Sequence, residues 1–432
     1  MTIVRILIPL AILVGLDIYA YQAVRVIARR WAPLGWARRA YWWVHGAFYL
    51  ALVGAPLAAL GGFRLPPRGY YYLITLFVLM YVPKIAAAAV LLLEDVSRAG
   101  RWIWRRLARL FRPAPPPAPV AAAGISRKEF LSLAAVSLAG IPFAGIVHGV
   151  VRDRYAFTVR RERIVLPHLP AAFGGFRIVQ LSDIHVGSFD DLEAVRDGIA
   201  LANDQGADLI VFTGDLVNNL VDELGAYREV FAALRAPQGV LSVLGNHDYG
   251  DYYPWPGDRE RAIHFQRMLD CHRELGWRLL RNEHVLVARG DDRLAVIGVE
   301  NWSARRGFSR YGDLARAVRD LPDVPVQVLL SHDPTHWDGE VRERYPRIDL
   351  TLSGHTHGFQ FGVETPGFRW SPVQYVYRQW AGLYREGGQY LYVNRGFGHI
   401  AFMGRVGIRP EITVFELARE APDHRRLGPD QA

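Results

Sequence analysis

Four long apolar segments fill the first third of this 432-residue chain and set the strongest limit on what it can fold into. Each is long enough for the roughly 20 residues that a helix needs to cross a bilayer. Aromatic residues cluster near several of their ends, as is typical of membrane interfaces. The segments are Ile3–Ile27, Tyr41–Gly62, Tyr70–Leu93 and Phe130–Val151. The sequence therefore predicts a bundle of about four transmembrane helices ahead of the remaining chain.

The positive charge of the chain lies in this membrane region. Residues 1–128 hold 17 Lys and Arg against 3 Asp and Glu, whereas residues 129–432 have a net charge of −5. The C-terminal part therefore lacks the basic surface that nucleic-acid binding requires, and we expect no nucleic-acid partner. Because the loops after the first and third segments are the most basic, the positive-inside rule places both in the cytoplasm. The chain from residue 152 onward is then expected on the exoplasmic or periplasmic side of the cytoplasmic (inner) membrane.

Composition predicts five consecutive parts. They are a membrane domain with three spans (1–112), a Pro-rich cytoplasmic linker (113–128), a fourth span (129–151), a catalytic domain (152–420) and a flexible tail (421–432). Arg127-Lys128, just before the fourth span, is either a twin-arginine-like export signal or an ordinary basic flank. Asp17 and Lys84 lie within spans, where ionisable groups are costly unless paired, so they form either an ion relay or a structural pair.

From residue 152 onward, short apolar runs alternate with helical patterns. We expect strands at 176–182, 208–213, 239–244, 294–299, 326–330, 349–352, 389–393 and 411–417, and helices at 190–203, 227–235 and 259–275. Helices separate the early strands, and loops separate the late ones. This pattern favours two packed sheets with helices outside them.

Polar motifs follow five of the expected strands. They are Asp183-Ile184-His185, Gly214-Asp215, Gly245-Asn246-His247-Asp248, His332-Asp333 and Gly354-His355-Thr356-His357. Ligands gather at the carboxyl ends of strands in open α/β sheets, so these motifs are expected to meet in space. Residues i and i+2 of an extended chain point the same way. Asp183 and His185 are therefore expected to reach one ion, and His355 and His357 to face a common centre.

The donor set of these motifs indicates the kind of metal. Carboxylate and amide oxygens mixed with imidazoles suit Mn, Fe or Zn. Two such ions would need a shared ligand between them. That role falls on Asp215, which is central in the set.

The order of the motifs resembles that of the calcineurin-like metallophosphoesterase family, over about residues 174–418. The resemblance implies an α/β fold, a four-layer αββα sandwich, with a dinuclear site where a hydroxide bridging the metals attacks phosphorus in line. Carried over by motif, the ligands are Asp183, His185 and His357 for one metal, Asn246, His332 and His355 for the other, and Asp215 as the bridge. His247 would be the general acid for the leaving oxygen, steered by Asp248.

Within this family the chain looks most like a membrane-anchored branch, which includes periplasmic phosphodiesterases and enzymes that cleave a UDP-diacylglucosamine lipid precursor. Phe359 departs from that branch, where a second Gly often follows the last histidine motif. The segments Tyr249–Pro256 and Phe359–Tyr384 are rich in aromatic residues. These residues either meet a lipid tail or the bilayer surface, or pack the loops on their own sheet. Arg395 is either a phosphate ligand or part of a structural ion pair.

The sequence thus predicts a multi-pass, membrane-anchored phosphoesterase with two divalent ions. Its substrate would be a phosphodiester or phosphomonoester, lipid-linked or from the cell envelope. One alternative is a UDP-2,3-diacylglucosamine-type pyrophosphate hydrolase, but that lipid precursor is made on the cytoplasmic face. The second alternative is a non-catalytic metal-binding membrane module, which would have lost a ligand or the proton donor; the motifs here keep both.

Overall fold

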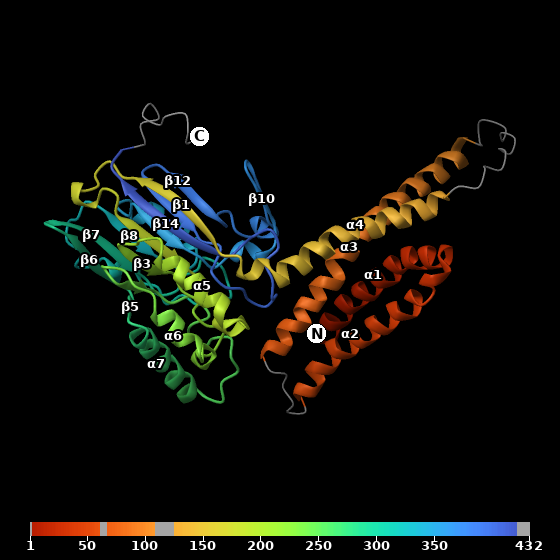
Figure 1. The fold of residues 1–432 in the computed structure, drawn as a ribbon, viewed down its shortest axis with the longest axis horizontal. Helices are drawn as coiled ribbons and strands as arrows, with labels where there is room; N and C mark the ends of the chain where they lie inside the picture. Colours follow the sequence, from red (N-terminus) through yellow and green to blue (C-terminus); the bar gives the residue numbers. More distant parts are fainter. Residues whose placement is uncertain (1, 61–66, 109–124, 421–432) are drawn as a thin grey trace. The chain divides into compact units, whose positions relative to one another are not determined.

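The computed structural model describes residues 2–60, 67–108 and 125–420. They belong to two compact units, Met1–His148 and Gly149–Ala432, of which the first is helical and the second α/β (Figure 1). The Pro-rich run at 113–119, the end of the second expected span at 61–62 and the tail at 421–432 lie outside the described residues.

The first unit is built from long helices. These are α1 (Thr2–Arg30), α2 (Ala37–Leu60), α3 (Pro67–Ala108) and α4 (Arg127–Val151), whose last residues belong to the second unit. Three helical stretches, Leu7–Arg30, Arg68–Ala108 and Arg127–Val151, are long and apolar enough to cross a membrane. Over its described residues α2 does not meet that measure, and its first turn carries Arg38 and Arg39.

Helix α3 continues beyond the end of the expected span at Leu93. Its last turns are polar, and Glu94 pairs with Arg101 (3.2 Å) and with Arg127 (2.6 Å). Such charged side chains favour helix in water as well as at an interface. The apolar pattern therefore marks the span, whereas the helix itself runs further.

A buried polar cluster joins three of these helices. Asp17 of α1 is fully buried, and its Oδ1 lies 2.5 Å from Lys84 Nζ of α3 and 3.3 Å from His45 Nε2 of α2. Its Oδ2 accepts hydrogen bonds from the hydroxyls of Tyr49 (α2) and Tyr81 (α3). Charges among apolar helices are tolerated when they are paired and hydrogen-bonded. The two ionisable residues expected within spans thus form a pair that links the helices.

Two six-stranded mixed sheets form the second unit. In spatial order the first sheet contains β1 (Thr158–Val165), β14 (Glu411–Ala418), β2 (Arg177–Leu181), β3 (Leu209–Phe212), β4 (Val240–Ser242) and β5 (Trp277–Leu279). The second contains β12 (Gly382–Glu386), β13 (Gln389–Val393), β9 (Leu350–Ser353), β8 (Gln327–Leu330), β7 (Asp292–Gly298) and β6 (Glu283–Arg289). Strands β2 to β5 run parallel, and so do β13, β9, β8 and β7.

Alternating side chains on the strands build the layers of the unit. Ile178 and Leu209 point into an apolar core between the two sheets. Their neighbours Val179 and Ile210 pack instead under α5 (Leu192–Asn203), α6 (Tyr227–Ala232) and α7 (Asp258–Glu274) (Figure 1). Leu329, on the outer face of the second sheet, packs in a third core with α8 (Leu314–Ala317), and α9 (Arg342–Arg344) follows. The four-layer αββα fold is thereby confirmed.

The expected elements of this unit are present, and the structure adds others. The eight expected strands correspond to β2, β3, β4, β7, β8, β9, β13 and β14, and the three expected helices to α5, α6 and α7. Strand β1 reads as polar because Arg160, Arg161 and Arg163 interrupt it. It forms because it is an edge strand, half exposed, that pairs along its length with β14. A separate hairpin of β10 (Val363–Thr365) and β11 (Phe368–Trp370) was also not expected.

Replacing Asp17 with Leu should lower the stability of the membrane unit by about 3–5 kcal/mol, because Lys84 is then buried without its carboxylate. We expect a lower melting temperature for the full-length protein in detergent. The double variant Asp17→Leu/Lys84→Met removes both charges and should recover most of the loss. A single variant that melts with the wild type would show that the cluster does not hold the helices together.

Candidate metal centre

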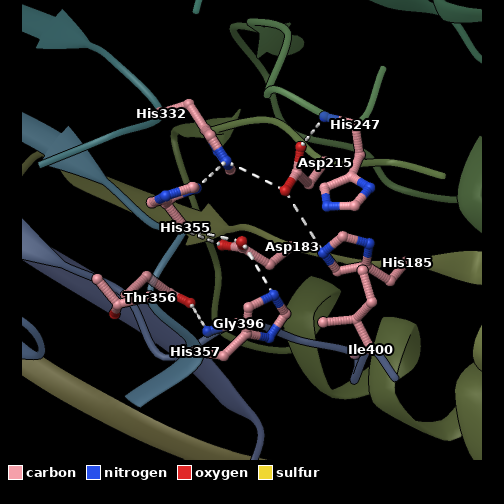
Figure 2. A network of polar contacts seen from close by, with 12 residues as sticks. Asp183, His185, Asp215, His247, His332, His355, Thr356, His357, Gly396 and Ile400 are labelled. Carbon is pink, nitrogen blue, oxygen red and sulfur yellow. Dashed lines mark hydrogen bonds and ion pairs between the residues drawn. The ribbon is translucent and has the colours of Figure 1, made fainter. Parts of the chain in front are cut away.

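The residues of the five motifs lie at the carboxyl ends of neighbouring strands. Asp183 and His185 follow β2, Asp215 follows β3, Asn246 and His247 follow β4, His332 follows β8, and His355 and His357 follow β9. Parallel pairing aligns the ends of β2, β3 and β4 in one sheet and of β8 and β9 in the other. Figure 2 shows the aspartate and histidine side chains of this set turned toward one another.

Left-handed backbone recurs at this site. The residues with positive φ are Asp183 (52°), His185 (47°), Asp215 (61°), His355 (70°) and His357 (52°). A non-glycine residue in such a conformation costs of order 1–3 kcal/mol, and such residues cluster at functional sites. Long-range hydrogen bonds hold the conformation: the carboxylate of Asp183 accepts from the His355 backbone N–H at 3.0 Å. The chain therefore turns at both Asp-x-His and His-x-His instead of running extended.

The acidic and imidazole side chains form two groups. Within each group the potential ligand atoms all lie within 4.8 Å of one another, and the groups are Asp183, His185, His357 and Asp215, His332, His355. His355 and His357 therefore face different groups, in agreement with the assignment that the family resemblance implied, whereas their spacing in an extended chain predicted a common centre. The reason is that His355 and His357 both have left-handed backbone, with Thr356 in the right-handed helical region between them, so the chain turns here and is not extended.

Asp215 belongs to the second group and also reaches the first. Its Oδ2 is 3.4 Å from Nε2 of His185 in one group and 3.1 Å from Nε2 of His332 in the other (Figure 2). Its Oδ1 accepts a hydrogen bond from the backbone N–H of His247 at 2.9 Å. The same carboxylate oxygen thus reaches both groups, while the second oxygen keeps the side chain in place.

The hydrogen-bond inventory of the site fits divalent cations. Asn246 is buried and its Oδ1 has no hydrogen-bond partner among the residues that the structure describes, although its Nδ2 donates to the Tyr252 hydroxyl at 3.0 Å. A buried, unsatisfied oxygen costs about 1–3 kcal/mol, and a metal ion would relieve this cost. His332 donates from Nδ1 to the Thr213 carbonyl at 2.8 Å, which leaves Nε2 directed to the site. Metal-binding histidines are commonly held this way.

His247 and Asp248 have separate surroundings. The Nδ1–H of His247 donates to the Asn218 carbonyl at 2.6 Å, and its ring lies 4.9 Å from that of His185. Asp248 instead accepts backbone N–H groups at the ends of two strands, from Asp215 (2.9 Å) and Gly245 (2.8 Å) among others. Burial and the nearby Asp215 charge raise the pKa of Asp248 to about 7. Among the described contacts none joins the Asp248 carboxylate to the His247 ring, contrary to the expected steering role.

Opposite charges dominate the electrostatics of the site. Burial by itself would lower the pKa of His332, but the carboxylates of Asp215 and Asp183 raise it to about 10. Burial would raise the pKa of Asp215, yet the neighbouring His332 and His247 hold it well below its usual range. Burial lowers the pKa of His185 and thus favours its neutral, ligating form. Ionised carboxylates are what a divalent cation requires, and a cation bound here would take the place of the proton on His332.

Three further side chains contact the site, and none of them was among the residues expected to bind metal. The Tyr377 hydroxyl lies 2.9 Å from Nε2 of His355, and Asp333 Oδ2 lies 3.5 Å from the same nitrogen. Arg405 is fully buried, donates to the Arg395 carbonyl at 2.7 Å and lies 3.4 Å from Nδ1 of His357. Asp333 belongs to the motif His332-Asp333 and Tyr377 to the aromatic segment Phe359–Tyr384, whereas no local pattern marks Arg405.

Arg395 lies outside both groups. Its Nη2 is 2.6 Å from Glu364 Oε1 and its Nη1 is 2.7 Å from Glu411 Oε2, and all three side chains are buried or nearly so. Of the two readings for this residue, the geometry shows the structural ion pair.

Gly354 allows β9 to end directly against β2. A Cβ at this position would lie 2.0 Å from Ser182 Oγ and 2.1 Å from Asp183 Oδ2, distances at which atoms overlap. The absence of a side chain at Gly354 is therefore what lets the Asp183 carboxylate take its place beside His355 and His357.

Comparison with known proteins places the chain in a family. Residues 176–359 match the family described as "Calcineurin-like phosphoesterase", and residues 4–154 match that described as "Probable Calcineurin-like phosphoesterase, transmembrane domain". The chain is 32% identical over 302 residues to the Bacillus subtilis "Uncharacterized metallophosphoesterase YkuE", covering 68% of this chain and 98% of that protein.

Two further relatives agree. The Escherichia coli "Phosphodiesterase YaeI" is 29% identical over 296 residues, 68% of this chain and 99% of that protein. The Danio rerio "Transmembrane protein with metallophosphoesterase domain" is 28% identical over 276 residues, 62% of this chain and 59% of that protein. The chain belongs to the calcineurin-like metallophosphoesterase family and carries the transmembrane domain found with it. It is a membrane-anchored, multi-pass metallophosphoesterase with two groups of Asp and His side chains suited to divalent metal ions.

Gly354→Ala should weaken metal binding by about 10- to 100-fold, because the new methyl group displaces the Asp183 carboxylate. Metal bound per chain, measured after dialysis against a series of free Mn concentrations, checks this result. Gly388→Ala is the matched control, since a Cβ there meets no atom within 4 Å. Equal metal retention by the two variants would contradict the packing argument.

Proposed function

We propose that the second unit hydrolyses a phosphate ester with two divalent ions held between the ends of its sheets. The observation that carries this proposal is the position of Asp215, whose Oδ2 lies within 3.4 Å of His185 in one group and 3.1 Å of His332 in the other. A carboxylate shared in this way is the feature that two neighbouring cations require.

The proposed ligands follow the geometry. Asp183, His185 and His357 would hold one ion, Asn246, His332 and His355 the other, and Asp215 both. The ions, Mn, Zn or Fe by the chemistry of these donors, would activate a water molecule and neutralise charge on the phosphoryl group. The unpartnered Oδ1 of Asn246 supports its assignment as the amide ligand.

His247 is proposed as the general acid. Because its Nδ1–H is committed to the Asn218 carbonyl, Nε2 is the nitrogen available to hand a proton to the leaving oxygen. Asp248 acts on this residue only through the backbone, by holding the turn that carries His247. Asp248 is therefore a positioning residue.

The substrate is proposed to be a phosphodiester or phosphomonoester on the outer side of the cytoplasmic membrane. The name "Phosphodiesterase" of the Escherichia coli relative supports the diester. The basic loops after the first and third spans support the outer placement. The same placement counts against a UDP-2,3-diacylglucosamine-type precursor, and the complete set of ligands and proton donor counts against a non-catalytic module.

Turnover should require added metal, and it should be lost in different ways on substitution of Asp215 and of His247. The full-length protein in detergent, stripped and reloaded separately with Mn, Zn and Fe, is tested on a chromogenic phosphodiester and the matching monoester. Asp215→Ala should lose both metal binding and turnover. His247→Gln should keep two ions per chain while turnover falls about 10²- to 10⁴-fold. Full turnover by Asp215→Ala would contradict the dinuclear mechanism, and full turnover by His247→Gln would contradict the proton donor.

The side of the membrane is tested with fusions after residue 432. A β-lactamase fusion should confer resistance and a green fluorescent protein fusion should stay dark, because both report an exoplasmic C-terminus. The same pair of reporters after Asp95, in the third helix, is the control and should give the reverse pattern. Fluorescence from the fusion after residue 432 would place the metal centre in the cytoplasm and favour the lipid-precursor substrate.

A further inference from the structure

An apolar surface that the described part of the chain leaves exposed lies beside the metal centre. Its side chains and their exposed fractions are Phe359 (60%), Val363 (46%), Phe368 (57%), Tyr375 (78%) and Val376 (50%). We call this set the apolar rim. It borders the centre, because Phe359 is two residues after His357, and Tyr377, next to Val376, contacts His355. Exposed apolar side chains gathered in this way mark an interaction surface.

The rim is held rigidly from below. Val373, Tyr377 and Trp380 pack with Ile408 in a small core beneath it. Trp370 Nε1 donates to the Tyr375 hydroxyl at 3.3 Å, which ties the hairpin to the following loop. The exposed side chains are thus the outer layer of an ordered structure.

The hairpin that carries much of the rim joins the first sheet through side chains and not through strand pairing, since Glu364 of β10 lies 2.7 Å from Nη2 of Arg160 in β1. Within the described residues, β10 and β11 pair with each other and with neither six-stranded sheet. A two-stranded hairpin is only marginally stable in water by itself. Phe359 is also unusual in its backbone, because it is a bulky, exposed residue with a φ of 59°, a conformation that bulky side chains rarely adopt. The ion pairs of Glu364 account for one face of the hairpin, but they do not account for the exposed Val363 and Phe368 on its other face.

The base of the rim adjoins the point where the chain leaves its last membrane helix. The final residues of α4, Gly149–Val151, belong to the second unit, and charged residues resume at Arg152. The Gly149 carbonyl accepts the Arg405 N–H at 3.1 Å, and a Cβ on Gly149 would lie 2.6 Å from the Arg405 carbonyl oxygen.

The next residue along continues this contact to the rim. The Val406 N–H donates to the Gln360 carbonyl at 2.8 Å, and the Val406 carbonyl accepts from Gly362 at 2.9 Å. Gln360 and Gly362 lie between Phe359 and Val363 of the rim. A single strand of chain, Arg405–Val406, therefore separates the end of a membrane-spanning helix from the root of the rim.

A basic side chain, that of Arg305, lies at the edge of the same surface. Arg305 donates from Nη1 to the Val376 carbonyl at 2.8 Å, and its guanidinium lies 4.9 Å from the centre of the Tyr377 ring. Its side chain is exposed. Aromatic and apolar side chains with an adjacent basic residue form the combination that binds a bilayer surface, with the rings among the acyl chains and the cation at the headgroups.

From these observations we propose that the apolar rim inserts into the surface of the bilayer that α4 spans, and so holds the opening of the metal centre at the lipid headgroups. The occupant is the membrane itself, because the exit of α4 adjoins the root of the rim. This contact does not depend on which ester the centre hydrolyses.

The test places an environment-sensitive fluorophore on single cysteines in the full-length protein. Phe368→Cys and Tyr375→Cys report the rim from two segments. Asp291→Cys reports the exposed turn between β6 and β7, at the opposite end of the strands from the metal ligands. The native Cys271 is buried, so the unsubstituted chain is the labelling blank. Each protein is reconstituted in vesicles of phosphatidylethanolamine and phosphatidylglycerol, with or without lipid that carries a quencher near the headgroup.

We expect the quencher to remove about half of the emission at positions 368 and 375 and to leave position 291 unchanged, because only the rim reaches the lipid. Emission unchanged at all three positions would overturn the proposal. Equal quenching at all three would also overturn it, since the contact would not belong to the rim. Blue-shifted but unquenched emission at 368 and 375 would overturn it in favour of a cover made of protein, such as a second copy of the chain.

Discussion

The metal centre depends on the buried carboxylate of Asp248, which holds two of the ligand-bearing turns by hydrogen bonds. It accepts backbone N–H groups from Asp215 (2.9 Å), Leu216 (2.8 Å) and Val217 (3.3 Å) after β3, and from Gly245 (2.8 Å) after β4. These bonds tie together the two turns that carry Asp215, Asn246 and His247. Since an unpaired buried N–H or carboxylate is costly, neither turn can move without losing several bonds at once.

The remaining ligands of the metal centre depend on these hydrogen bonds of Asp248, because the ligands come from both sheets and meet at Asp215. Asp215, once in place, brings the group near β2 and the group near β8 and β9 within reach of one oxygen atom. Left-handed backbone at Asp215 and at the other ligands with positive φ costs free energy. It persists only where several contacts hold each residue in that conformation. Gly354 serves the same end by removing the one side chain that would separate β9 from Asp183.

Membrane attachment and catalysis meet in the segment after His357. That segment first contacts Arg405–Val406, which adjoins the end of α4, and then forms the apolar rim and supplies Tyr377 to His355. One stretch of chain therefore connects the exit of a membrane helix with a side chain at the metal centre. In the proposed arrangement the bilayer orients the opening of the site, which gives a physical reason for an enzyme of this kind to carry its own spans.

The sequence by itself indicated which residues carry donor atoms for a metal, where eight of the strands lie and three of the segments that are long and apolar enough to cross a membrane. These properties are local: a buried strand reads as an apolar run, a span as a longer one, and a ligand by its donor atom. Only the tertiary structure showed how His355 and His357 come to face the different groups that the family resemblance implied, that the described bonds of Asp248 go to backbone N–H groups, and that Arg395 pairs with Glu364 and Glu411. It also revealed Arg405 and the edge strand β1. The reason is that the direction of a side chain in a turn follows from backbone angles, and here long-range hydrogen bonds impose angles that the local sequence does not favour.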